Sequence, residues 1–340
     1  MGRTKISGRA GLAVLLVAGA LSLGAGARLQ AASRPVQVTP ELSVVMAHFE
    51  AGRYDRARVE LVNAIARAPR DAALYHWLGR TYLQMGDDDQ AIANAQEAVA
   101  LAPETSEYHR WLGRAYGDKA DRTRSFWLAR KVKGEFERAV ELDPANIAAR
   151  LDLMEFYLDA PWVVGGGHGK ARDQVEAIAA LDAVQGDLAR ATYLIDDGRT
   201  DQAAAAYGRV LAMRPSEADP YFEAAAFYVH RRNTGGLEAA IAGAGRVAPS
   251  DRRLDFYRGV AEVLAGARAG SAETWLLSYL SAAPSGDNCP SPASAHLWLG
   301  RFYEHAGRVD AAIAQYQQVL QLVPDQQAAR DALDRLRSAR

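Results

Sequence analysis

The sequence returns to one phrase at regular intervals: a small residue, an aromatic residue three positions later, an alanine in mid-phrase, and a proline twenty-four positions after the small residue. The clearest copies are Gly79, Tyr82, Ala91 and Pro103, then Ala225, Tyr228 and Pro249, then Gly300, Tyr303, Ala312 and Pro324. Pro69 to Pro103 and Pro215 to Pro249 are each 34 residues apart. A period of this length is too long for a heptad and matches a pair of helices in a stacked array. The phrase therefore predicts an all-α chain of helix–turn–helix units.

The residues between the prolines support this reading. Ala-rich amphipathic stretches of about a dozen residues are separated by turn residues that lie near the midpoint between two periodic prolines. These breaks are Gly52-Arg53, Gly86-Asp87, Asp197-Gly198-Arg199 and Gly307-Arg308. No sustained alternation of apolar and polar residues indicates a strand. We expect the small residue to allow close approach of the two helices, and the proline to end the second helix because it lacks an N–H group.

At this point the residues resemble tetratricopeptide repeats, which carry the same small-residue, aromatic, alanine and proline pattern over 34 residues. The resemblance implies a right-handed superhelical α-solenoid with about eight repeats over residues 40–324. It also implies a polar-faced capping helix over residues 325–340. The expected first positions of the repeats lie near Val38, Ala72, Ser106, Ile147, Val184, Ala218, Arg252 and Ala293.

Two predicted units, 106–144 and 147–183, are irregular. The proline spacing before Pro144 is 41 residues, and the surplus extends to Trp127. The second irregular piece holds Trp162, Gly165, Gly166, Gly167 and His168. Insertions in solenoids lie on one edge and often at the working face, so we interpret both pieces as insertion loops. The glycine-rich piece does not have the spacing of a phosphate-binding loop. It is either a structural loop with Trp162 tucked against a neighbour, or a ligand or partner contact.

The tryptophans before the Leu-Gly pairs are displaced from the family pattern. Trp77, Trp111 and Trp298 come two residues later than expected, which turns each side chain by about 200° around its helix. Their packing stays open at this stage.

The N-terminus has the form of an export signal. Arg3, Lys5 and Arg9 precede an apolar run over residues 11–24, and Ala27 ends a small-x-small motif. We predict a signal peptide over residues 1–27 with cleavage near Ala27, a flexible leader over residues 28–39, and a secreted or periplasmic protein without a stable membrane span. The alternatives are a mitochondrial-type presequence and a retained N-terminal anchor.

Composition excludes several functions. A net charge of −1 argues against a nucleic-acid partner. The single cysteine, Cys289, cannot form an intramolecular disulfide, and the histidines have no metal-ligand spacing. No nucleophile motif is present. The sequence therefore predicts no catalytic residue, metal or cofactor, and a protein that is not an enzyme, although residues joined across repeats would escape this test.

In the family, first-helix positions two, five, nine and twelve line the inner groove. Here the resemblance assigns to the groove His76, Arg80, Arg110, Arg114, Glu155, Phe222 and Phe256. The arginines resemble in placement the clamp by which some family members hold a peptide's C-terminus, although the asparagine of that clamp is missing. The implied partner is a protein or peptide with an acidic or C-terminal carboxylate segment. Equally open is that these arginines are solvated or paired with Glu107 and Glu155.

Two functions follow from this reading. The first is a scaffold or adaptor of the cell envelope that binds a partner segment in the groove. The alternative is a small-ligand-binding helical-repeat component associated with periplasmic transport, in which the pieces around Trp127 and Trp162 wall off a cavity.

Overall fold

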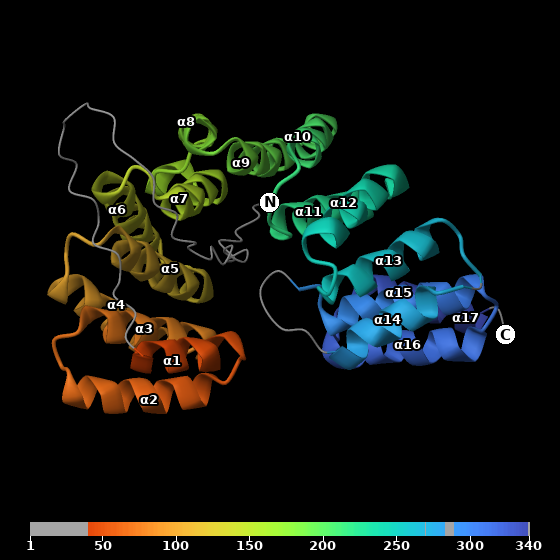
Figure 1. The fold of residues 1–340 in the computed structure, drawn as a ribbon, viewed down its shortest axis with the longest axis horizontal. Coiled ribbons are helices and arrows are strands. Elements are labelled where there is room, and N and C mark those ends of the chain that lie inside the picture. Colours follow the sequence, from red (N-terminus) through yellow and green to blue (C-terminus); the bar gives the residue numbers. More distant parts are fainter. Residues whose placement is uncertain (1–39, 269, 283–288, 339–340) are drawn as a thin grey trace. The chain divides into compact units, whose positions relative to one another are not determined.

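The computed structural model describes residues 40–268, 270–282 and 289–338, and within these ranges it contains helices and no strand (Figure 1). The predicted signal peptide and leader lie outside the described residues, as does most of the linker before Cys289. The all-α fold predicted from the repeated phrase is confirmed. In the described part, no helix is both long enough and apolar enough to cross a membrane.

The chain divides into two compact units, with the boundary between Gly198 and Arg199. The helices of the first unit are α1 (Pro40–Glu50), α2 (Tyr54–Arg67), α3 (Ala72–Met85), α4 (Asp88–Leu101), α5 (Ser106–Thr123), α6 (Phe126–Leu142), α7 (Ile147–Asp159), the short 3₁₀ turn η1 (Trp162–Val164), α8 (His168–Leu181) and α9 (Ala183–Asp196). The helices of the second unit are α10 (Thr200–Met213), α11 (Asp219–His230), α12 (Thr234–Val247), α13 (Arg253–Leu264), α14 (Ala272–Ala282), α15 (Pro292–His305), α16 (Val309–Leu322) and α17 (Gln327–Ser338).

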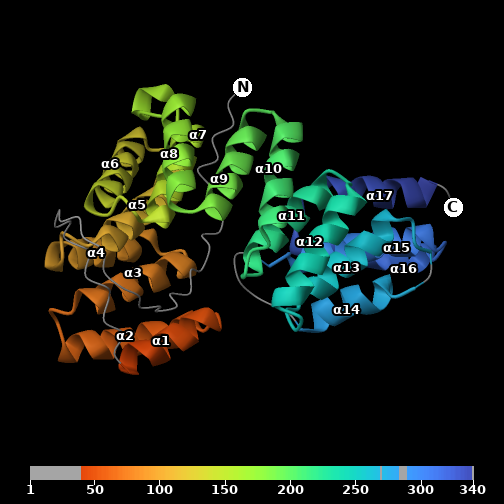
Figure 2. The same cartoon turned by 45° about the horizontal axis from the view of Figure 1, so that its top comes forward.

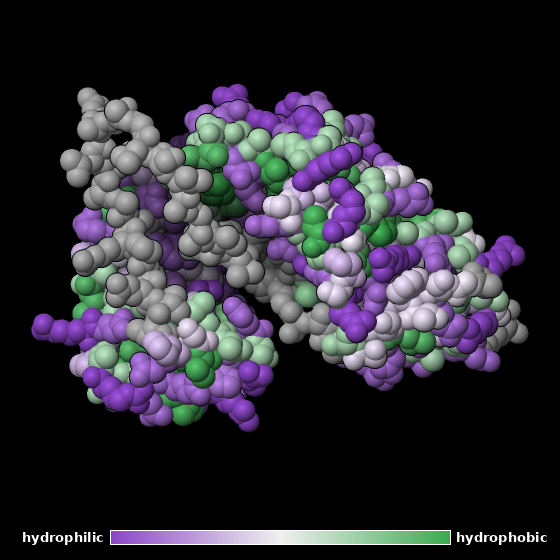
Figure 3. Space-filling model, in the orientation of Figure 1, coloured by the Kyte–Doolittle hydropathy of each residue, from purple (hydrophilic) through white to green (hydrophobic). Residues whose placement is uncertain are grey.

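Within each unit, successive helices pack as antiparallel neighbours. Figures 1 and 2 show α3 beside α4 and α5 beside α6 in the first unit, and α15 beside α16 in the second. The face drawn in Figure 3 carries scattered hydrophobic patches among hydrophilic residues. The apolar side chains that hold the helix pairs together are mainly buried, and the first such core joins Leu42, Leu61 and Leu74 from α1, α2 and α3.

The small residues of the repeated phrase stand where two helices touch. A Cβ atom at Gly79 would lie 3.1 Å from the Ala91 carbonyl oxygen on α4. At Gly113 it would lie 2.5 Å from the Phe136 ring, and at Gly300 2.6 Å from the Tyr316 ring. A larger residue at these positions would force the facing helix or its side chain to shift, so the predicted role of these positions in close helix approach is confirmed.

The turn between α3 and α4 shows how each pair is closed. Gly86 has φ 77°, a left-handed conformation that side chains disfavour. The carboxylate of Asp87 then accepts a hydrogen bond from the Gln90 N–H and caps α4. The predicted turn at Gly86-Asp87 is thereby confirmed.

The predicted insertion loop around Trp127 is wrong. Helix α5 has 18 residues and α6 has 17, whereas the other α-helices of the described chain have 11 to 14, so the surplus lengthens both helices. No proline interrupts this stretch. Arg124 makes the turn with φ 51°, and the Ser125 hydroxyl accepts a hydrogen bond from the Leu128 N–H to start α6. Trp127 consequently lies on the first turn of α6.

The second irregular piece is a short turn, and the prediction that Trp162 tucks against a neighbour is wrong. Trp162 begins η1 and is 84% exposed. Val164 is the residue buried beneath the turn. His168, which the sequence assigns to the loop, is the first residue of α8, because the glycines before it already complete the change of direction.

Candidate functional site

The first helices of three predicted repeats carry the same four-residue phrase, Trp-Leu-Gly-Arg. It occurs at residues 77–80 on α3, 111–114 on α5 and 298–301 on α15. Positions three apart on a helix lie one above the other, so the arginine can reach over the tryptophan ring one turn earlier. The guanidinium carbon lies 3.9 Å from the ring centroid for Arg80 and Trp77, 4.8 Å for Arg114 and Trp111, and 4.3 Å for Arg301 and Trp298. The sequence analysis left the packing of the three tryptophans open, and in the structure each ring packs against the arginine three residues later.

Arg80 has the most unusual surroundings of the three arginines. Its guanidinium carbon lies over the rings of both Trp77 on its own helix and Trp111 on α5, the latter at 4.2 Å. Its Nε atom is shielded from solvent and has no hydrogen-bond partner. Burial is the largest influence on this side chain and lowers the pKa of Arg80 to about 10, so the guanidinium stays charged at neutral pH. The structure therefore holds a cation by aromatic rings instead of by a carboxylate.

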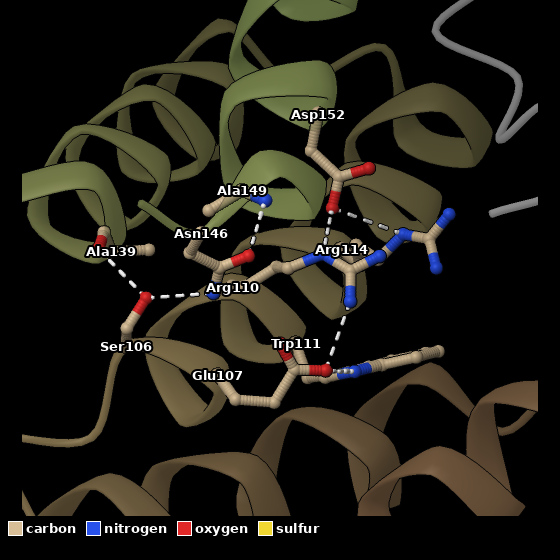
Figure 4. A network of polar contacts seen from close by, with 9 residues as sticks. All are labelled: Ser106, Glu107, Arg110, Trp111, Arg114, Ala139, Asn146, Ala149 and Asp152. Atoms are coloured by element: carbon tan, nitrogen blue, oxygen red, sulfur yellow. Dashed lines mark hydrogen bonds and ion pairs between the residues drawn. The ribbon is translucent and has the colours of Figure 1, made fainter. Parts of the chain in front are cut away.

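Arg110, in contrast, is buried and is hydrogen-bonded to two carboxylates. Its Nε donates to Asp152 on α7 at 2.7 Å, and its Nη1 donates to Glu107 at 2.9 Å. Figure 4 shows Arg110 between Asp152 on one side and Glu107 with Trp111 on the other. Burial alone would lower the pKa of Arg110, but the charges of Asp152 and Glu107 and their hydrogen bonds outweigh it and raise that pKa. Its charge is thus neutralised inside the first unit.

Arg114 shares the carboxylate that holds Arg110. Its Nε lies 3.5 Å from the same Asp152 oxygen (Figure 4). The proposed pairing with Glu107 is therefore correct for Arg110, and the carboxylate that Arg110 and Arg114 share is Asp152, three residues before the half-buried Glu155. The carboxylate that joins α7 to α5 was missed by the sequence reading, which followed only the expected groove positions.

A chain of hydrogen bonds fixes the start of α7 against α5 and α6. The Ser106 hydroxyl donates to the Ala139 carbonyl at 2.8 Å and accepts from the Asn146 side chain at 2.9 Å. The Asn146 side-chain oxygen in turn accepts from the Ala149 N–H at 3.0 Å and caps α7 (Figure 4). Asp152 is held in register with Arg110 by this chain.

His76 is buried among aromatic rings beside the arginines. Its ring lies 5.0 Å from that of Tyr108 and 6.1 Å from that of Trp111. Burial, and then the charges of Arg80 and Arg110, hold the pKa of His76 well below its usual value. His76 is neutral at pH 7, so Arg80 is the cation of this cluster that makes no ion pair with any described residue.

The two phenylalanines assigned to the groove are in the interior of the second unit. Phe222 is 3% exposed and Phe256 is 4% exposed. Phe222 stacks on the Tyr257 ring at 5.7 Å, and the Arg253 guanidinium lies 4.1 Å above it. The prediction that these rings line an open groove is wrong, because rings of successive repeats cover one another.

The second unit contains the third Trp–Arg pair, which the sequence reading did not single out. Burial lowers the pKa of Arg301, and no carboxylate in the described part of that unit bonds to it. The repeated Trp-Leu-Gly-Arg phrase is the signal that identifies both Arg80 and Arg301. Across the described ranges, no three His, Cys, Asp or Glu side chains are grouped as a metal site would require.

Comparison with known proteins agrees with the architecture. Sequence models described as tetratricopeptide repeat match residues 48–115, and residues 188–235 and 286–329. No curated protein sequence matches this chain.

Solved structures with a similar fold include the APC/C hetero-tetramer Cut9–Hcn1, with a TM-score of 0.53 and 14% identity over 87% of this chain and 55% of that chain. A thermophilic TPR protein of Thermus thermophilus has a TM-score of 0.46 and 24% identity, over 58% of this chain and 97% of that chain. PilF of Pseudomonas aeruginosa has a TM-score of 0.44 and 13% identity, over 77% and 97%. The paired helices and the matched segments show that this chain contains tetratricopeptide repeats.

Proposed function

We propose that the protein is a non-enzymatic scaffold or adaptor that binds an acidic segment of a partner protein at Arg80, on α3 of the first unit. One observation carries this proposal: the Arg80 Nε is shielded from solvent without a hydrogen-bond partner, while the guanidinium is clasped by Trp77 and Trp111. Neighbouring Arg110 and Arg114 already share Asp152, so they do not compete with Arg80 for the partner's carboxylate.

Magnitudes support a ligand at this position. A buried donor without a partner costs about 1 to 3 kcal/mol, and more when it is charged. Each cation–π contact of a partly desolvated arginine returns about 0.5 to 2 kcal/mol, which holds the guanidinium in place in the free protein. A carboxylate that accepts from Nε and a terminal nitrogen would form a bidentate, charge-assisted pair with a cation that is already desolvated and oriented.

The fold supports a scaffold role in general terms. Tetratricopeptide repeats serve mainly as surfaces for protein partners, and the Cut9–Hcn1 hetero-tetramer is an example of a similar fold inside a protein assembly. Function still depends on the site and not on the fold, so Arg80 is the residue that must be tested.

The proposal includes the cell envelope as the place of action. The basic residues, the apolar run over residues 11–24 and the small residues up to Ala27 support export. Fractionation of cells and N-terminal sequencing of the purified protein test this part. A mature chain that begins after Ala27 agrees with it, and an uncleaved chain in the cytoplasmic fraction contradicts it.

Calorimetric titration with acidic peptides tests the binding role. Each peptide is used with a free and with an amidated C-terminus, against the wild type, Arg80→Met and the control Arg56→Met, an exposed arginine on α2. We expect Arg80→Met to weaken binding at least about tenfold and Arg56→Met to leave it unchanged. If amidation abolishes binding, the peptide's C-terminal carboxylate is the group that Arg80 binds. If binding is retained, Arg80 binds side-chain carboxylates. Equal affinity of the wild type and Arg80→Met contradicts the proposal.

A further inference from the structure

A second feature of the first unit is a surface where α6 and η1 meet. We define this α6–η1 surface by Phe126, Trp127, Arg130 and Lys133 on α6 and by Trp162 and Val163 on η1. Its three aromatic side chains are turned to solvent: Trp162 is 84% exposed, Trp127 68% and Phe126 62%. Exposed aromatic rings on a helix and on the turn packed against it usually mark an interaction surface.

The turn that presents Trp162 is firmly built. Val164 is buried, the Gly165 N–H donates to the Trp162 carbonyl at 3.0 Å, and the Gly167 N–H donates to the Tyr157 carbonyl at 2.8 Å. A Cβ atom at Gly166 would lie 1.8 Å from the Ala160 carbonyl oxygen, so the backbone here is packed against the end of α7. The exposure of Trp162 thus follows from a fixed backbone.

Basic side chains separate the aromatic residues. A shallow cavity of about 380 Å³ lies between α6 and η1, and its lining includes Arg130, Lys133 and Glu137 on one side and Trp162 on the other. Trp127 precedes Arg130 by one helical turn and so stands at the end of the same helix face. Aromatic rings therefore border a charged floor.

The charge of this surface is positive. Arg130 is exposed and makes no ion pair with a described residue. The carboxylate of Glu137 is 3.3 Å from the Lys133 amine and also accepts a hydrogen bond from the Tyr157 hydroxyl at 2.9 Å. The single carboxylate of Glu137, which already pairs with Lys133 and Tyr157, cannot balance both Arg130 and Lys133.

We propose that the α6–η1 surface docks on an anionic lipid membrane. Tryptophan rings settle at the level of the lipid headgroups, where an apolar ring with a polar N–H is favoured, and nearby Arg and Lys attract the lipid phosphates. The charged floor between the rings favours headgroups over a helix of a protein partner, which needs an apolar groove. The export signal or anchor that we predict over residues 11–24 would also bring the chain to a membrane.

Fluorescence of the full chain with brominated lipids tests the proposal. Residues 1–39 contain no tryptophan, so quenching by brominated acyl chains reports the remainder of the chain and not the apolar run. The probes are vesicles of phosphatidylcholine alone and of phosphatidylcholine with phosphatidylglycerol. We expect quenching with the mixed vesicles and little with phosphatidylcholine alone. Absence of quenching with the mixed vesicles overturns the proposal.

Sedimentation with the mixed vesicles then tests the residues. The double variant Trp127→Ala/Trp162→Ala should bind at least about tenfold more weakly, and Arg130→Glu, a change of two charges, about thirtyfold more weakly. The controls Leu322→Ala and Arg56→Glu, both at exposed positions, should bind as the wild type does. Equal binding by all variants would mean that the apolar run alone holds the chain, and it would overturn the proposal.

The two proposals can fail separately. Arg80→Met should keep its affinity for the mixed vesicles, whereas Trp127→Ala/Trp162→Ala should keep its affinity for acidic peptides. If the double variant loses a protein ligand and retains vesicle binding, the surface is a protein interface and the lipid proposal is wrong.

Discussion

The guanidinium of Arg80 lies 3.9 Å from the centre of the Trp77 ring, and its Nε is closed off from water without an acceptor. Two opposing effects meet in this pair. The ring quadrupole attracts the cation, whereas loss of water around an unpaired donor disfavours it. The Trp77 and Trp111 contacts return about 0.5 to 2 kcal/mol each, and the unpaired donor costs about 1 to 3 kcal/mol, so the net contribution of the charge to folding should be small.

Arg80→Met should therefore change the free energy of unfolding by no more than about 1 kcal/mol, since methionine keeps an apolar stem between the rings and removes the unpaired donor. Urea denaturation followed by circular dichroism measures this. A loss of about 3 kcal/mol or more would show that the guanidinium is a structural element with a partner in solution.

Asp152→Ala should behave in the opposite way. It leaves Arg110 buried with only Glu107 and removes the nearest carboxylate from Arg114, so we expect a loss of about 3 to 5 kcal/mol in the same denaturation experiment. Adding Arg110→Met to Asp152→Ala should restore part of that loss, because the unpaired charge is gone. The exposed Asp89→Ala is the control. A double variant less stable than Asp152→Ala would contradict this explanation.

The repeat boundaries show what the sequence could supply. The expected first positions Ala72, Ser106 and Ile147 are the first residues of α3, α5 and α7. Local chemistry determines these boundaries. Asp71 and Asn146 cap the helices that follow them, and glycines stand where two helices come close together or where a turn is left-handed. Such signals lie within a few residues of the feature that they specify.

The parts that the sequence could not supply depend on distant contacts. Asp152 reaches Arg110 across 42 residues, and only the packing of α7 on α5 brings them together. Phe222 is covered by a ring from the next repeat, and the direction of Trp162 follows from backbone hydrogen bonds of the turn. The helical extension to Trp127 was ambiguous because inserted residues without a breaker can equally form a loop or lengthen helices.

Stability should fall as the pH rises above about 6.5 because of His109. Burial lowers the pKa of His109, but its hydrogen bonds to Glu135 at 2.7 Å and to the Pro103 carbonyl at 2.9 Å outweigh burial and raise that pKa above 6.5. A histidine whose pKa is higher in the folded state than in the unfolded state stabilises the fold fully at pH values below its unfolded-state pKa. This contribution is lost as the pH rises through its folded-state pKa.

The measurement is the free energy of unfolding as a function of pH in the wild type and in His109→Gln and Glu135→Gln. Both substitutions should remove the decline that His109 causes above pH 6.5. The pKa of His76 is lowered, so His76 changes the free energy of unfolding below pH 6.5 and does not contribute to the decline above it. An identical decline in the wild type and both variants would exclude His109 as its source.

Gly166→Ala should destabilise the first unit and displace Trp162. The new Cβ atom would lie 1.8 Å from the Ala160 carbonyl oxygen, so the turn must move, at a cost of about 1 to 3 kcal/mol. Gly169→Ala is a matched control because nothing lies within 4 Å of its Cβ position inside α8, and it should stabilise by up to about 1 kcal/mol. Thermal unfolding and vesicle binding measure both effects. Equal stability of the two variants would contradict the packing described for the turn.

The central claim is that Arg80 receives a carboxylate from the partner. Proton–nitrogen correlation NMR of the arginine Nε–H groups tests it most directly, with the Arg80 signal identified by its absence in Arg80→Met. We predict that this signal shifts as an acidic peptide is added and saturates together with binding, because the Nε that has no acceptor in the free protein then gains one. A peptide that binds while the Arg80 Nε–H signal stays unchanged would contradict the account.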